Sequence, residues 1–253
     1  MLSLVVALSR NLPVPLQNNL ILTSGSLVAN NFNLTVGGNV NIENGTAYTP
    51  GTNTTILNGN ADQTFTINLA SALSLYGLNI NKPAGVSLTI AGSQGTLNIT
   101  NSFNLTLGTL NDGGKTVNIS GNIYNSGVHT GTGAIVLNST SVQTIDGAGI
   151  FQNLTLDNTN AVAAPVSLLA RITINGVLTF SQDKLFNIGI HNLLLNSAAS
   201  ISGSGSTRYL QTAGNAGDGG LTKVYSAITP FIFPVGAPTL IPVRAVELNP
   251  IVA

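Results

Sequence analysis

Cysteine and tryptophan are absent from this sequence, methionine occurs once, and charged residues make up only 6% of the chain. A chain without cysteine is stabilised without disulfides, which fits a bacterial exported protein. Since an ordinary globular domain has about 25% charged residues, uncharged side chains must solvate this surface. Lys plus Arg and Asp plus Glu number eight each, so no net field attracts nucleic acid or anionic lipid, and a nucleic-acid partner is not expected.

Long hydrophobic runs are also missing. No apolar stretch approaches the ~20 residues that a membrane-spanning helix needs, so membrane insertion is not expected. Residues 1–8 are largely apolar, but no basic residue precedes this run and no convincing cleavage site follows it. The sequence therefore predicts a strand there instead of a signal peptide. An export signal is expected upstream, and the composition favours an extracellular location at the bacterial cell surface.

The residues that are present favour β-structure. Leu, Val, Ile and Ala supply most of the 43% hydrophobic content, whereas aromatic residues contribute only 5%. Asn, Thr, Ser and Gly take the place of charged residues on the polar faces. A length of 253 residues is enough for one large β domain or two small ones with a substantial core.

Short segments that alternate aliphatic and polar residues recur along the chain, and each has one apolar and one polar face. The sequence predicts strands at residues 33–36, 64–69, 77–80, 87–90, 104–107, 153–156 and 171–174. Clusters of Gly and Asn, which adopt positive φ at low cost, predict turns at residues 37–39, 43–45, 111–114 and 146–149. No segment keeps a helical period, so the predicted fold class is all-β.

Internal repetition appears at two scales. Two patterns recur 80 residues apart (63 to 143 and 86 to 166), namely Gln63-Thr64 with Gln143-Thr144 and Val86-Ser87-Leu88 with Val166-Ser167-Leu168. A finer period of roughly 20 residues is typical of solenoid coils and gives about four coils to each larger repeat. We therefore predict a right-handed parallel β-helix (β-solenoid) with coils about 4.8 Å apart. Tandem antiparallel β-sandwiches are the alternative.

The composition changes toward the C-terminus. Residues 212–220 are rich in Gly and predict a linker or long loop, and residues 229–238 contain three prolines and two phenylalanines, which indicate a junction. We assign residues 1–211 to the β-solenoid repeat region. Residues 212–253 are assigned to the Gly-rich loop and the Pro/Phe-rich junction, which leads into a further, truncated β segment.

Three successive motifs and a later one resemble a known repeat. They are Gly131-Thr132-Gly133-Ala134-Ile135-Val136-Leu137-Asn138, Gln143-Thr144-Ile145-Asp146-Gly147, Phe151-Gln152-Asn153-Leu154-Thr155-Leu156 and Phe233-Pro234-Val235-Gly236. This succession resembles the repeat region of large secreted cell-surface proteins of Bacteroidota, adhesin-like β-repeat proteins associated with type nine secretion. The resemblance covers most of residues 20–245. Filamentous-haemagglutinin-like adhesins share the same general pattern.

The resemblance implies export through the type nine pathway, a very long multidomain parent chain, and adhesive or structural duty at the cell surface. The C-terminal sorting domain of that family is not in this sequence, which leaves the export route open.

Few residues could carry chemistry. His129 and His191 are the only histidines, neither stands at a metal-ligand spacing, and both are expected on the surface. Polysaccharide-cleaving β-helix enzymes need carboxylates a few ångströms apart, and the candidates are Asp62 and Asp146, which follow comparable strands one repeat apart, and Asp157 at a strand end.

Asp146-Gly147 and Asp112-Gly113, however, predict turns first. Asp218 stands alone in its Gly-rich run, so a calcium site is not expected.

Two further patterns have compositional explanations. Thr64 and Thr66, or Thr130 and Thr132, could belong to a flat Thr array like that of ice-binding solenoids, but such an array needs a constant coil length. Sequons occur at Asn33, Asn44, Asn53, Asn98, Asn104, Asn118, Asn138 and Asn153. In a chain so rich in Asn and Thr they carry no inference of glycosylation.

The sequence therefore predicts no catalytic, cofactor-binding or metal-binding residue, no cofactor and no enzyme activity. We expect a structural or adhesive module of a long extracellular bacterial surface or filament protein, acting as stalk, fibre or adhesin. A polysaccharide-binding or polysaccharide-cleaving β-helix and an ice-binding solenoid are the alternatives. Open coil ends predict lateral or end-to-end association with neighbouring domains of the same chain or with identical subunits, and surface polysaccharide is a further expected partner.

Overall fold

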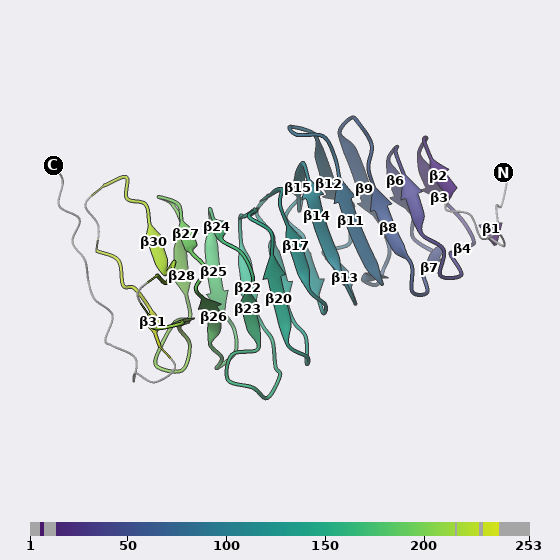
Figure 1. Ribbon diagram of the computed structural model, residues 1–253. Helices are drawn as coiled ribbons and strands as arrows, with labels where there is room; N and C mark the ends of the chain where they lie inside the picture. The colour runs from purple at the N-terminus through teal and green to yellow at the C-terminus, as the bar shows by residue number, and fades with distance from the viewer. Residues whose placement is uncertain (1–5, 8–13, 216, 228–229, 238–253) are drawn as a thin grey trace. The chain divides into compact units, whose positions relative to one another are not determined.

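The computed structural model describes residues 6–7, 14–215, 217–227 and 230–237, and these contain strands but no helix (Figure 1). The chain forms two compact units, Met1–Ala134 and Ile135–Ala253, called here the N-terminal and C-terminal units. Strand β19 (Ala134–Leu137) starts at the last residue of the N-terminal unit and is described with the C-terminal unit, to which its other residues belong. Each unit is a stack of coils in which a strand pairs with the third strand after it along the chain, so three strands make one coil.

The N-terminal unit has three faces, and neighbouring strands on each face are parallel. The first face contains, in order, β2 (Val14–Leu16), β5 (Leu34–Val36), β8 (Thr54–Leu57), β11 (Gly77–Asn81), β14 (Phe103–Leu107) and β17 (Ile123–Asn125). The second contains β3 (Leu20–Leu22), β6 (Val40–Ile42), β9 (Gln63–Ile67), β12 (Ser87–Ala91), β15 (Thr109–Asn111) and β18 (Val128–Thr130).

The third face of this unit is split into two sheets. One contains β1 (Val6–Ala7), β4 (Ser26–Val28) and β7 (Ala47–Thr49), and the other contains β10 (Leu73–Leu75), β13 (Thr96–Ile99) and β16 (Thr116–Ile119). β7 is the last strand of the first sheet and β10 begins the second. The coil ladder is therefore interrupted at one place on one face.

The C-terminal unit is built in the same way. One face contains β20 (Gln143–Asp146), β23 (Val166–Leu168), β26 (Phe186–Gly189), β29 (Leu210–Thr212) and β31 (Val235–Gly236). The next contains β21 (Ile150–Phe151), β24 (Ile172–Ile174), β27 (Leu193–Leu195) and β30 (Leu221–Lys223). The last contains β19 (Ala134–Leu137), β22 (Leu154–Leu156), β25 (Val177–Phe180) and β28 (Ser200–Ser202).

The predicted all-β parallel solenoid is confirmed, because every described pair of named strands is parallel. An isolated bridge between Gly205 and Arg208, outside the named strands, is antiparallel. Antiparallel sandwiches, the alternative, are excluded. Each predicted strand at residues 33–36, 64–69, 77–80, 87–90, 104–107, 153–156 and 171–174 coincides with an observed strand to within two residues at either end.

Aliphatic and aromatic side chains from successive coils stack in register to form the core. In the N-terminal unit, Phe103 lies between Leu78 and Ile123, which precede and follow it by 25 and 20 residues (103 − 78 and 123 − 103). All three side chains are buried. In the C-terminal unit, Phe186 lies in the same way between Val166 and Leu210. Burial of one such side chain contributes about 1.5–3 kcal/mol, and the absence of polar partners makes each position intolerant of charge.

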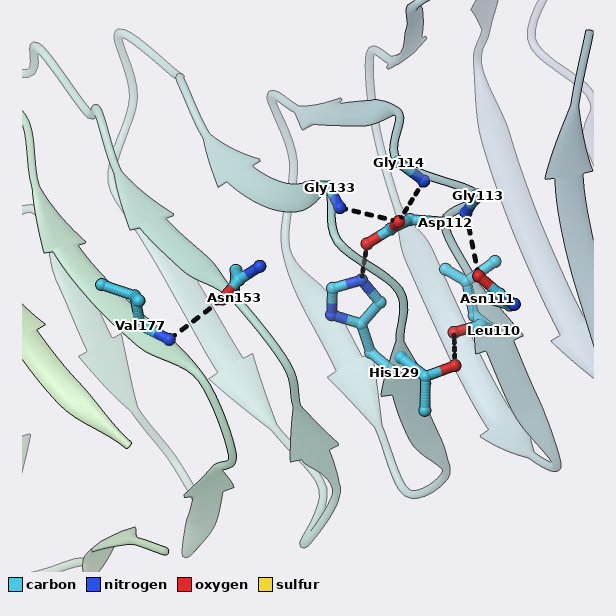
Figure 2. A network of polar contacts seen from close by, with 10 residues as sticks. Leu110, Asn111, Asp112, Gly113, Gly114, His129, Gly133, Asn153 and Val177 are labelled. Atoms are coloured by element: carbon cyan, nitrogen blue, oxygen red, sulfur yellow. Dashed lines mark hydrogen bonds and ion pairs between the residues drawn. The ribbon is translucent and has the colours of Figure 1, made fainter. Parts of the chain in front are cut away.

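Corner ties connect the coils where the chain turns between faces. We use this name for an Asn or Asp side-chain oxygen that accepts the backbone N–H of a residue about one coil later. Asn39 receives Thr64 N–H at 2.8 Å and Asp62 receives Ser87 N–H at 2.8 Å in the N-terminal unit. In the C-terminal unit, Asn153 receives Val177 N–H at 3.0 Å (Figure 2). Since backbone donors near a turn need a partner, these ties satisfy them along the stacking direction.

The ends of the described chain bear on two further predictions. Of residues 1–8, the predicted N-terminal strand, only β1 (Val6–Ala7) is described. The predicted loop at residues 212–220 starts at the last residue of β29 and ends just before β30. Phe231 and Phe233 pack edge to face with ring centroids 4.9 Å apart in the Pro/Phe-rich junction, and the β segment predicted beyond it lies outside the described residues.

Candidate functional site

His129 was expected on the surface, and this expectation is wrong. Its side chain is fully buried, and its Nε2 lies 2.9 Å from Oδ2 of Asp112, which is also fully buried (Figure 2). The reason is the register of β18, where Val128 and Thr130 point outward and His129 points inward beside Leu110. His191 lies in the turn after β26 and is partly exposed.

Asp112 is the centre of a buried polar cluster in the N-terminal unit. Its Oδ1 accepts the backbone N–H of Gly114 at 2.7 Å and of Gly133 at 2.9 Å (Figure 2). Gly131 passes so close that a Cβ there would lie 2.1 Å from Asp112 Oδ1, and its φ of +111° favours glycine. The expected turn at Asp112-Gly113 is present. The Asp112 carboxylate also joins this turn to the turn in the next coil, which contains Gly131 and Gly133.

The surroundings of Asp112 favour the ionised carboxylate. Burial alone would raise the pKa of Asp112, but hydrogen bonds from His129, Gly133 and Gly114 outweigh it and hold the pKa below its ordinary value. The cluster is thus a buried ion pair or charge-assisted hydrogen bond. Because both side chains are fully buried, the pair is better suited to fixing two turns than to acting on a substrate.

The other candidate carboxylates do not form a cleaving site. Asp62 lies in the exposed loop before β9, whereas Asp146 is the last residue of β20, so the two do not follow comparable strands as expected. Asp146 Oδ1 accepts Gly147 N–H at 2.7 Å, and Asp157 Oδ1 accepts Gln182 Nε2–H at 2.6 Å. Asp218 Oδ2 accepts Gly214 N–H at 2.6 Å within its loop. These contacts are those of turn and corner residues.

Metal ligands do not gather in the part of the chain that the structure describes, where no group of three or more His, Cys, Asp or Glu side chains could hold an ion. Among the same residues, no helix has the length and apolar character to cross a membrane.

The glutamines that recur 80 residues apart make the same local contact at two different corners, because Gln63 begins β9 and Gln143 begins β20, which belong to different sheets. Gln63 Oε1 accepts Gly59 N–H at 3.1 Å, and Gln143 Oε1 accepts Ser139 N–H at 3.3 Å, four residues back in each case. Both glutamines are buried. The sequence repeat therefore marks a recurring local contact of a buried amide, a role that the sequence pattern alone did not reveal.

A donor from the following coil completes each of these corners. In the N-terminal unit, Lys82 Nζ donates to Gly59 O at 2.8 Å, Ala61 O at 3.1 Å and Gln63 Oε1 at 2.6 Å. In the C-terminal unit, Asn158 Nδ2 donates to Ser141 O at 2.7 Å and to Gln143 Oε1 at 2.8 Å. An ammonium and an amide thus serve the same purpose, which indicates that Lys82 is a structural cation.

Lys82 should make stability depend on alkaline pH. Burial lowers its pKa to about 8, against the opposing attraction of Asp62. Between that pH and about 10.4, the unfolded chain binds one more proton than the folded protein, so the free energy of unfolding should rise by up to about 1.4 kcal/mol per pH unit relative to Lys82→Met. Urea denaturation of both proteins from pH 7.5 to 9.5 measures this difference. Asn81→Ala, an exposed neighbour, is the control, and an equal pH dependence of the wild type and Lys82→Met would contradict the prediction.

The threonines do not form an extended regular face. Thr64 and Thr66 point outward from β9, and Thr89 lies beside Thr64 in the next coil. The row then continues with Asn111, while Ala91 lies beside Thr66. Thr130 is on β18, but Thr132 lies in the turn after it. The strict two-rank array that an ice-binding face needs is therefore interrupted within two coils.

A cavity of about 540 Å³ lies at the break between β7 and β10. Its walls come from residues 44–51 and 69–76 and from Thr100, and include Tyr48 and Tyr76. The hydroxyl of Tyr48 lies 3.2 Å from Thr55 Oγ1 and accepts Asn53 Nδ2–H at 3.0 Å. Burial raises the pKa of Tyr48, and these two hydrogen bonds oppose the rise. No motif in the sequence marks this place.

These stacked parallel coils define the class of protein as a parallel β-solenoid. No protein-family model, no curated protein and no solved structure matches this chain.

Proposed function

We propose that this chain is a structural and adhesive module of a long extracellular bacterial surface or filament protein, acting as stalk, fibre or adhesin. The observation that supports this most is the unbroken stacking of coils on two faces of the N-terminal unit, where parallel ladders join every strand to the next. Continuous backbone hydrogen bonding together with corner ties gives a stiff repetitive element. Motifs such as Gln143-Thr144-Ile145-Asp146-Gly147, which resemble repeats of Bacteroidota surface proteins, support the same proposal.

The chemistry of the described residues also favours a passive module over an enzyme. The carboxylates of Asp146 and Asp218 are held by local hydrogen bonds, that of Asp157 accepts a hydrogen bond from Gln182 in the next coil, and the buried Asp112 is paired with His129. General acid–base cleavage of a glycosidic bond needs two accessible carboxylates in one groove. Binding that is spread over a surface needs no such pair of carboxylates. Lateral or end-to-end contact with neighbouring domains or identical subunits would cover any open coil ends.

Surface exposure on the source bacterium is the direct test. An antibody raised against the purified chain should label intact, unpermeabilised cells and should detect a parent protein much longer than 253 residues. In sedimentation, the purified chain should associate, because a solenoid coil that no neighbouring domain covers offers its strand edges to another subunit. Labelling only after permeabilisation, with a cytosolic protein as the control for cell integrity, would refute the proposed surface location. A monodisperse monomer in sedimentation would count against the proposed association with identical subunits.

A further inference from the structure

The break on the third face leaves two strand edges beside one cavity. β7 ends one sheet and β10 begins the next, and residues of both strands line the cavity of about 540 Å³. The edges present backbone N–H and C=O groups that no neighbouring strand of a sheet uses. The volume lies within the range of about 300–1,000 Å³ that small-molecule sites occupy. The place is thus large enough for a ligand and rich in unused hydrogen-bonding groups.

The wall of this cavity is neutral. None of its lining residues is charged. The side-chain hydroxyls of Thr49, Ser71, Ser74 and Tyr76 make no hydrogen bond to another described residue. A charged ligand would lose hydration here without gaining an opposite charge. A ligand that brings several uncharged donors and acceptors would instead find partners on both strand edges and on the hydroxyls.

The two tyrosines add apolar surface to this polar wall. Tyr48 is fixed by its hydrogen bonds to Thr55 and Asn53, whereas the hydroxyl of Tyr76 is unengaged among the described residues. An aromatic ring with a polar tip presents a flat apolar face and a hydrogen-bonding edge in one side chain. Pyranose rings have the complementary character, with C–H groups on their faces and hydroxyls around their rims.

We propose that the cavity between β7 and β10 binds a neutral oligosaccharide. The rings of Tyr48 and Tyr76 contact its sugar rings, and the side-chain hydroxyls and the two strand edges form hydrogen bonds with its hydroxyl groups. The proposal names a ligand class for the adhesive part of the proposed function, and it rests on that proposed function.

A peptide strand is a poorer occupant of this cavity. The same two coils pair directly on the other two faces, β5 with β8 and β6 with β9, and an inserted strand would need about twice the 4.8 Å strand spacing.

Calorimetric titration of the whole chain tests this proposal. The probes are cellohexaose, mannohexaose and chitohexaose as neutral saccharides, with oligogalacturonate as the acidic comparison. At least one neutral probe should bind, and oligogalacturonate should not. Tyr76→Ala should weaken binding about tenfold, because one ring contact is lost. Tyr124→Ala is the control, because Tyr124 is a 40% exposed tyrosine on β17, outside the cavity. This variant should change the affinity by less than about twofold.

A second variant separates loss of binding from loss of folding. Ser74→Arg keeps both rings but places a bulky cation in the cavity at an exposed position, and it should abolish binding while circular dichroism stays that of the wild type. Three results would overturn the inference. The first is that no neutral probe binds up to about 10 mM, and the second is that Tyr76→Ala and Tyr124→Ala have equal affinities. The third is that an extended peptide binds and the neutral saccharides do not. Antibody labelling of intact cells is an independent readout, so failure here leaves the proposed surface role standing.

Discussion

Replacing Phe103 with alanine should lower the free energy of unfolding by about 3–5 kcal/mol, as expected for removal of a large buried aromatic side chain. Phe103 has no exposed surface and fills one level of the core between Leu78 and Ile123. The solenoid interior is too narrow for distant side chains to refill the space. Urea denaturation followed by circular dichroism measures the loss.

The adjacent residue is a matched control for this prediction. Asn104 lies on the same strand but points outward, beside Asn79 and Tyr124, so Asn104→Ala should change stability by no more than about 0.5 kcal/mol. Because a coil contacts only its neighbours, amide exchange in Phe103→Ala should accelerate first in β11, β14 and β17. Equal losses in the two variants would show that the alternation of buried and exposed positions on β14 is incorrect.

Asp112→Ala should cost about 3–5 kcal/mol, the usual effect of removing one partner of a buried ion pair. The variant leaves His129 and the N–H groups of Gly114 and Gly133 without their acceptor. Asp146→Ala is the control, because Asp146 is only partly buried and accepts a single turn N–H; its loss should be about 1 kcal/mol. The double variant Asp112→Leu with His129→Leu should recover much of the stability, since an apolar pair leaves no charge unpaired.

The same pair predicts how stability responds to acid. The folded pKa of Asp112 lies below its ordinary value, so its contribution is present above the unfolded pKa of about 3.9 and is lost as pH falls through the lower folded value. The difference in unfolding free energy between the wild type and Asp112→Ala should therefore shrink as pH falls below about 4. A difference that persists unchanged at pH 2 would mean that the carboxylate charge contributes nothing.

Local alternation made the strands predictable, because a period of two places every second aliphatic residue on one face. The segment Asn104-Leu105-Thr106-Leu107 illustrates both the strength and the limit of that rule, since Leu105 is buried but Leu107 is 46% exposed. The reason is the irregular pairing where β11 meets β14, at which Asn81 lies opposite Leu107. Register between coils is a property of two distant segments, and local pattern does not contain it.

The buried polar residues were harder to predict for the same reason. In Val128-His129-Thr130, hydrophobicity favours valine as the inward residue, yet the register with Leu110 turns His129 inward. The 80-residue recurrence of glutamine was visible, but its donors, Lys82 and Asn158, come from the next coil and share no residue type. The cavity beside Tyr48 results from a missing strand pair, which no composition or motif signals.

The corner ties described above have a consequence for the environment that this protein tolerates. In each, an amide or carboxylate oxygen accepts a backbone N–H, as at Asn39 and Asn153. Ion pairs between exposed side chains, such as Arg208 with Asp183, are a minor addition to these ties. Dissolved salt weakens attraction between exposed full charges but has little effect on short contacts between dipoles. A solenoid joined in this way should keep its cohesion in fresh water and in brine alike.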